Sequence, residues 1–201
     1  MRYLLIIILS FMFALNLSAQ EETLVTSDIE SGGFGGPVVK YTSIYNQGTL
    51  LVGGRGGWII NHSFVIGGGG YGTVTEIDAP SGIFPMQEPI DLYFGYGGLE
   101  LEYIFNPLAL GHFSVYLLIG GGSTFFARDL GHYDEDHNRV GEEDFVFVLE
   151  PAVNGELNIT DWFHINAGVS YRIVTDVEQA QLENSDFSGV TGNLTFKFGS
   201  F

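Results

Sequence analysis

The stretch Phe163–Val174, which reads FHINAGVSYRIV, alternates apolar and polar side chains along almost its whole length. The apolar positions are Phe163, Ile165, Ala167, Val169, Tyr171 and Ile173, and the positions between them are His164, Asn166, Gly168, Ser170 and Arg172. Only Val174 departs from this rule. Side chains on a β-strand point to opposite faces in turn, so the stretch predicts a strand with one apolar and one polar face. A strand of roughly 9–11 residues with this alternation is long enough to cross a membrane.

Seven further segments are strand-like in the same way. They are 36–45, 49–61, 64–76, 92–105, 113–128, 144–158 and 187–201. The connections 77–91, 129–143 and 177–186 are longer and acidic, whereas those that alternate with them are short. Consecutive antiparallel strands place alternate connections at opposite ends, so one end should carry short turns and the other longer loops. The sequence therefore predicts an all-β fold, an eight-stranded antiparallel up-and-down transmembrane β-barrel.

The first 35 residues are predicted to lie outside the barrel. Arg2, an apolar run from Leu4 to Leu15 and small residues before Gln20 are typical of a secretory signal peptide, which we place at 1–19. The apolar run is shorter than the ~20 residues that a membrane-spanning helix needs. Residues 20–35 are polar, acidic and glycine-bearing, and predict a flexible acidic lead-in. The barrel is then predicted at 36–201.

The chain is strongly acidic, with 24 Asp and Glu against 7 Lys and Arg and a formal net charge of −17. Nucleic-acid phosphates are bound by Lys and Arg, so this balance argues against a nucleic-acid partner. The absence of Cys excludes a disulfide-stapled fold and a thiolate metal site. The excess acid is concentrated in the lead-in and the long loops.

Apart from the terminal residues of the predicted strands, their charges lie on the polar faces and are balanced in sign. They are Lys40, Arg55, Arg172 and Lys197, together with Glu100, Glu102, Glu150 and Glu156. A narrow lumen tolerates ions where opposite charges pair, so we predict that these eight residues form a lumen charge network. One alternative is a narrow ion-conducting pore lined by the same groups. The other is a soluble secreted lipocalin-like ligand-binding barrel, whose apolar faces would turn inward, with Tyr171 and Ile165 buried and Arg172 exposed.

Aromatic residues gather near both ends of the predicted strands. Those at the short-turn end are Trp58, Phe64, Tyr103, Phe105, Phe113, Trp162 and Phe163, and those toward the other end are Tyr45, Tyr93, Phe125, Phe145 and Tyr171. Two such belts are typical of barrels whose ends lie at the two membrane–water interfaces. They favour lipid as the surroundings of the apolar faces.

These features together resemble the small outer-membrane β-barrels of Gram-negative bacteria, of the outer membrane protein A and X type. The resemblance covers the predicted mature chain and is one of pattern. It implies residence in the cell outer membrane, contact with outer-membrane lipid and recognition by the barrel-assembly machinery through a C-terminal aromatic residue. Here Phe201 is out of phase with Leu194, Phe196 and Phe198. Either a bulge resets the phase or the assembly signal is weaker than in that family.

Few residues suggest chemistry. Glycine clusters at 53–57, 67–70, 95–98 and 120–122 fall inside strands, with no helix after them, so they predict bending and space for large side chains instead of a phosphate site. Within the loop 129–143, Asp134, Asp136 and His137 form a candidate site for divalent cations. Arg139 stands where an EF-hand loop needs glycine. We predict no catalytic residue and no cofactor, and expect a non-enzymatic barrel with a structural or surface-interaction role.

Overall fold

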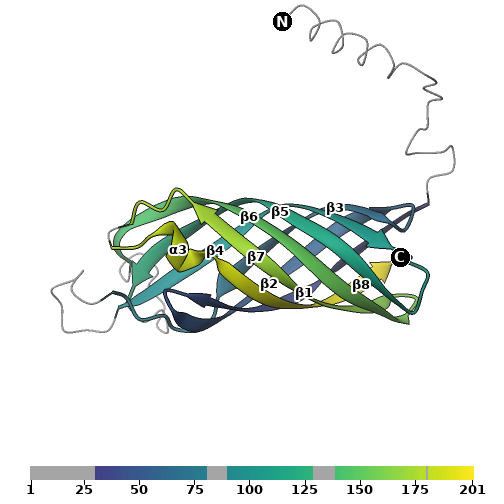
Figure 1. Cartoon of the computed structure of the whole chain (residues 1–201), viewed down its shortest axis with the longest axis horizontal. Coiled ribbons are helices and arrows are strands. Elements are labelled where there is room, and N and C mark those ends of the chain that lie inside the picture. The colour runs from purple at the N-terminus through teal and green to yellow at the C-terminus, as the bar shows by residue number, and fades with distance from the viewer. Residues whose placement is uncertain (1–29, 81–89, 129–138, 180) are drawn as a thin grey trace, which may run out of the picture.

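The computed structural model describes residues 30–80, 90–128, 139–179 and 181–201. Eight strands close into a barrel in chain order, with every neighbouring pair antiparallel (Figure 1). They are β1 Ser31–Ile44, β2 Gln47–Ile60, β3 Phe64–Thr73, β4 Asp91–Phe105, β5 Gly111–Ala127, β6 Arg139–Thr160, β7 Phe163–Thr175 and β8 Gly189–Ser200. The predicted fold, an all-β, eight-stranded antiparallel up-and-down barrel, is confirmed. A short helix, α3 (Asn184–Phe187), lies between β7 and β8.

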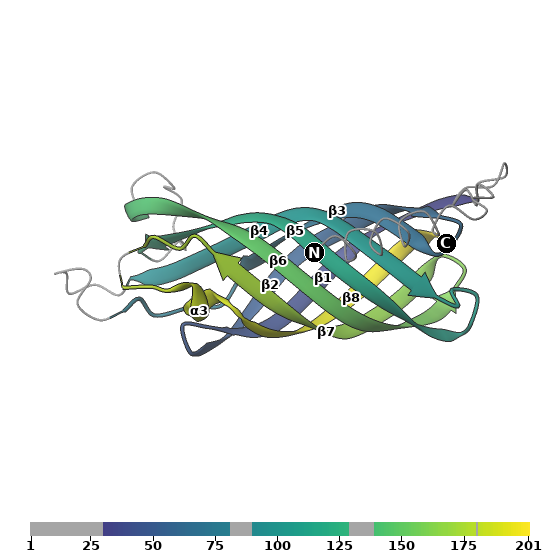
Figure 2. The same ribbon diagram turned by 45° about the horizontal axis from the view of Figure 1, so that its top comes forward.

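The two ends of the barrel differ. The connections at 61–63, 106–110 and 161–162 lie at one end, together with the start of β1 and the end of β8; we call this the turn end. The turn at 45–46, the described parts of the longer connections and α3 lie at the other, which we call the loop end (Figures 1 and 2). In the described part of the chain, no helix is long and apolar enough to span a membrane.

Strand β1 begins at Ser31, so the predicted boundary of the lead-in at residue 35 is wrong. Residues 31–35 pair with the end of β2 throughout, and Gly33 also pairs with Ser200 of β8. Their glycine content suggested a linker, but the long neighbouring strands supply backbone partners that a local pattern does not reveal. The rest of the lead-in up to residue 29, and the signal peptide, lie outside the described residues.

Strand β6 also starts earlier than predicted. Arg139 and Val140 continue the ladder opposite Ala127 and Phe126 of β5. The polar run before Asp144 looked like loop because its side chains are exposed. A hairpin that rises above its neighbours has no buried face there, and so it loses the apolar alternation by which strands are recognised.

The two faces of the sheet have opposite character. On β7, Tyr171 is 50% exposed on the outside while Arg172 next to it is fully buried inside. All eight strands present large exposed apolar residues outward, among them Tyr41, Trp58, Ile66, Leu99, Val115, Val153, Val169 and Val190. This arrangement is the reverse of the one that the soluble lipocalin-like alternative requires.

The barrel interior changes along its axis. Near the loop end it is filled by a cluster of apolar side chains that includes Leu92, Phe94, Phe126, Val174 and Phe187. Val174, the one exception to the alternation of its strand, therefore faces inward as part of this cluster. Charged and hydroxyl-bearing side chains occupy the middle.

A smaller apolar cluster lies at the turn end. It consists of Phe34, Ile59, Val65 and Ile104, with Phe201 packed against it. Strand β8 pairs with both neighbours without a register shift, so the bulge that could have reset the phase of Phe201 is absent from this strand. The ring of Phe201 points inward, and Phe198 faces outward with 43% of its surface exposed.

Candidate functional site: the charges inside the barrel

The structure places all eight side chains of the predicted lumen network inside the barrel. Their exposed fractions run from 0% to 7%. They come from β1, β2, β4, β6, β7 and β8, each at a position whose side chain points inward. Seven of the eight form ion pairs in three groups, and Arg172 contacts the first group through the ring of Tyr96.

The first group joins β1 to β6 across the barrel. Lys40 Nζ lies 2.9 Å from both carboxylate oxygens of Glu150 and 3.0 Å from the Tyr96 hydroxyl. Tyr96 and Ser170 donate hydrogen bonds to the same carboxylate. The ammonium also lies 3.7 Å from the centre of the Tyr71 ring, a cation–π contact. Glu150 is thus fully surrounded by donors.

The second group is centred on Arg55. Its Nε donates to Glu100 at 2.8 Å and its Nη2 to Glu102 at 2.9 Å. The hydroxyls of Tyr71 and Tyr116 both donate to Glu100, at 2.6 and 2.7 Å. One planar guanidinium therefore bridges two carboxylates on one strand. The compact ammonium of a lysine is less suited to this geometry.

The third group extends toward the turn end. Lys197 Nζ contacts Glu102 at 3.2 Å and also donates to Glu156. Glu102 accepts a further hydrogen bond from Ser114 at 2.6 Å. Glu156 is 2.9 Å from His164 Nδ1. Because Glu102 contacts both Arg55 and Lys197, the second and third groups form one continuous network.

Arg172 has no carboxylate partner among the described residues. Its Nε donates to the backbone carbonyl of Phe187 at 2.7 Å, and its Nη2 reaches the Thr42 hydroxyl at 3.4 Å. The guanidinium carbon lies 5.3 Å from the ring centre of Phe94 and 5.7 Å from that of Tyr96. Its Nη1 has no hydrogen-bond partner in the described part of the chain.

Sequence reasoning missed the residues that complete the network. Tyr71, Tyr96 and Tyr116 supply hydroxyl donors, and Ser114 and Ser170 supply two more. The signal was present, because each of these residues is in the inward phase of its strand. The glycine clusters give the network its space: a Cβ at Gly69 would lie 2.3 Å from Glu100 Oε1 and 2.7 Å from the Tyr71 hydroxyl.

The cavity at the centre of the network is small. A cavity of about 10 Å³ lies between the first two groups, lined in part by Lys40, Arg55 and Asn154. That is about the space required by one water molecule. The Asn154 Oδ1 atom has no protein partner within the described residues, so it is a natural contact for such a water.

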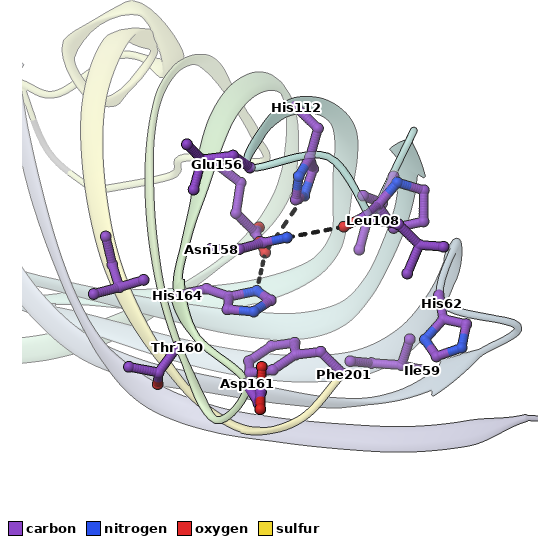
Figure 3. Close-up of a pocket in the computed structure, with 14 residues that line it drawn as sticks. Ile59, His62, Leu108, His112, Glu156, Asn158, Thr160, Asp161, His164 and Phe201 are labelled. Atoms are coloured by element: carbon purple, nitrogen blue, oxygen red, sulfur yellow. Dashed lines mark hydrogen bonds and ion pairs between the residues drawn. The ribbon is translucent and has the colours of Figure 1, made fainter.

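A larger pocket, of about 540 Å³, opens at the turn end (Figure 3). Glu156 lies between two imidazoles there, 3.7 Å from His112 Nε2 and 2.9 Å from His164 Nδ1. The ring of Phe201 stacks on His164 with 3.5 Å between the ring centres. Among the described residues, no group of three or more His, Asp or Glu side chains is placed to hold a metal ion. The candidate cation ligands Asp134, Asp136 and His137 lie outside the described residues.

The closed, antiparallel eight-stranded sheet with its apolar outer face has the fold of the small outer-membrane β-barrels. Two of the solved structures that share this fold serve for comparison. Neisserial surface protein A (NspA) matches with a TM-score of 0.52 and 12% identity over 87% of this chain and 99% of its own. The N-terminal β-barrel domain of OprF from Pseudomonas aeruginosa matches with a TM-score of 0.50 and 10% identity over 84% and 96%.

Such low identity shows a shared fold and nothing finer. No protein-family model matches the chain, and the comparison with curated protein sequences gave no match.

Proposed function

We propose that this protein is a non-enzymatic barrel of the cell outer membrane whose lumen is closed by its own charges. The observation that carries the proposal is the cross-barrel pairing of Lys40, Arg55 and Lys197 with all four buried glutamates. Eight strands enclose an interior only wide enough for side chains. Here those side chains bind one another, which favours a structural or surface-presenting role over transport.

The outer face supports a membrane location. Exposed aromatic residues gather at both ends of the barrel, as the girdles of membrane barrels do. Trp58, Tyr103, Phe105, Phe113 and Trp162 lie near the turn end, and Tyr41, Phe145 and Tyr171 lie toward the loop end. We therefore propose outer-membrane lipid as the partner of the apolar band and the barrel-assembly machinery as a transient partner. Phe198, with its outward ring, is a better candidate for that recognition than Phe201.

The loop end is the proposed surface-facing side. Described acids there include Glu142 and Glu143, and Arg139 pairs with Glu143 at 3.1 Å. Acidic side chains on a rim attract cations, so weak binding of divalent cations to the loops is part of the proposal. The narrow-pore alternative is disfavoured because the cavity between Lys40 and Arg55, at the centre of the network, has room for about one water molecule.

Fractionation combined with gel mobility tests this proposal. The protein should sediment with outer membranes, and the unboiled sample should migrate differently from the boiled one, because a closed barrel resists denaturation by detergent. Recovery in the soluble periplasmic fraction, with one mobility before and after boiling, would contradict the proposal.

A further inference from the structure

The segment 181–188, which we call the plug, packs two side chains into the loop end of the barrel. It contains α3, visible at the loop end in Figures 1 and 2. The ring of Phe187 is fully buried, with its centre 5.1 Å from that of Phe94. Leu182 of the plug is buried in the same apolar cluster. A segment between two strands thus inserts an aromatic ring into the mouth of the barrel.

Arg172 lies beside this ring and is incompletely satisfied. It is fully buried, and a buried guanidinium ordinarily pairs with a carboxylate through two parallel hydrogen bonds. Here the Phe187 carbonyl oxygen accepts one short bond, the Thr42 contact is long at 3.4 Å, and Nη1 is unpartnered within the described residues. Leaving a buried charged donor unpaired is unfavourable. A neutral carbonyl therefore occupies a position suited to an anion.

Phe187 places an aromatic ring and an oxygen acceptor where an aromatic carboxylate would place its ring and its carboxylate oxygens. Its ring packs on Phe94, and its carbonyl oxygen meets the Arg172 guanidinium. We infer that the loop-end mouth is a binding site for a small organic carboxylate with an aromatic or aliphatic group, and that Phe187 occupies this site as a built-in substitute ligand. The incoming carboxylate would replace one carbonyl oxygen with two charged oxygens at Arg172, and its apolar group would take the place of the Phe187 ring.

The plug is attached in a way that allows displacement. Apart from the Arg172 contact, hydrogen bonds join it to the barrel wall, from Tyr45 N to the Asp186 carbonyl at 2.8 Å and from Val174 N to Ser188 Oγ at 3.0 Å. The segment just before it adds local bonds, from Val177 N to Asn184 Oδ1 at 3.0 Å and from Leu182 N to the Gln179 carbonyl at 3.1 Å. Gln181, at its start, has a left-handed backbone with φ of 65°, a conformation that non-glycine residues seldom adopt. Its helix is a single turn of four residues. Displacement breaks the bonds to the barrel wall and removes Phe187 from the apolar cluster, and a ligand that fills the same place restores both the Arg172 contact and the ring packing.

The probe of choice is 3-phenylpropionate, which reproduces the ring, the Cβ and Cα carbons and the carbonyl carbon of Phe187. Titration calorimetry on the folded protein in micelles should show saturable binding. Phe187→Ala weakens the plug, and should tighten that binding at least tenfold relative to the wild type. Neutral 3-phenylpropanamide should bind the same variant at least tenfold more weakly than the acid. Adding Arg172→Met to Phe187→Ala should remove the preference for the acid.

Two further variants make the result decisive. Phe201→Ala removes an aromatic ring from the opposite mouth, where Arg172 is out of reach, and should leave the affinity at the wild-type value. If Phe187→Ala does not fold, as judged by gel mobility without boiling, Ser188→Ala loosens the plug without altering the ring and should also increase affinity. Equal affinity for acid and amide, or an unchanged preference after Arg172→Met, would overturn the inference.

Discussion

The ammonium group of Lys40 lies 2.9 Å from both carboxylate oxygens of Glu150, although the two residues are 110 positions apart in the sequence. The contact crosses the lumen from β1 to β6, two strands that are not neighbours in the sheet. Ion pairs of this kind connect the barrel through its interior in addition to the ladder of backbone bonds around it. They also fill the space that an ion would need.

Removing one partner of this pair should be strongly destabilising. In Lys40→Met, Glu150 keeps only the hydroxyls of Tyr96 and Ser170 as side-chain partners. A buried carboxylate without its cation costs about 3–5 kcal/mol of unfolding free energy. Urea unfolding in micelles, followed by tryptophan fluorescence, measures the loss. The double variant Lys40→Met with Glu150→Gln should recover much of it, and two additive losses would show that the pair is not coupled.

Arg55 should not be replaceable by lysine. Its Nε and Nη2 atoms contact Glu100 and Glu102 separately, and the compact ammonium of lysine lacks this planar fork. We expect Arg55→Lys to lower the free energy of unfolding by about 1–3 kcal/mol. Arg139→Lys is the matched control, because its pair with Glu143 is exposed and such pairs contribute about 0–1 kcal/mol. Equal losses at the two sites would contradict the account of the network.

Alanine substitutions at two glycines of β3, Gly69 and Gly72, test whether the network needs the space that Gly69 leaves. At Gly69 an added methyl group meets Glu100 Oε1 and the Tyr71 hydroxyl, which are fixed by their contacts with each other and with Arg55. Gly69→Ala should therefore cost about 1–3 kcal/mol of unfolding free energy. Gly72→Ala, where nothing lies within 4 Å of the new atom, should be close to neutral. Equal free energies of unfolding for Gly69→Ala and Gly72→Ala would contradict this account.

A charge on the outer face distinguishes lipid from water. Leu99 lies in the middle of β4 with its side chain 49% exposed on the outside. In a membrane, Leu99→Arg should cost about 2–4 kcal/mol, because the midplane is the most expensive place for a cation. Val74→Arg, beyond the loop end of β3, should cost about 0–1 kcal/mol. The free energy of unfolding in lipid vesicles measures both, and a negligible cost at Leu99 would speak against a lipid-facing position.

The period of two made the fold predictable from sequence. The alternation in Phe163–Val174 distinguishes the faces of a strand, and the long acidic connections distinguish the two ends of the barrel. The first and last residues of the strands were harder to predict from the sequence. The start of β1 at Ser31 depends on the lengths of β2 and β8, since a glycine-bearing segment has little pattern of its own.

The partners of the lumen charges could not be read from the sequence. The alternation along each strand predicts which residues face inward. Their positions along the barrel axis, however, depend on the stagger of all eight strands. The eight charges balance in number, which suggested that each base has an acid. Arg172 instead meets a backbone carbonyl from the plug, while Arg55 and Lys197 share Glu102. The plug has no periodic pattern of apolar residues from which its insertion into the barrel could have been predicted.

Electrical recording across a planar lipid bilayer tests the central claim of a lumen closed by its own ion pairs. The wild-type protein, inserted and verified as folded, should produce no steady single-channel current, because the cavity among the charged groups has room for about one water molecule. A sustained, reproducible conductance that changes its ion selectivity on Lys40→Met would contradict this claim and would assign the same residues to a pore.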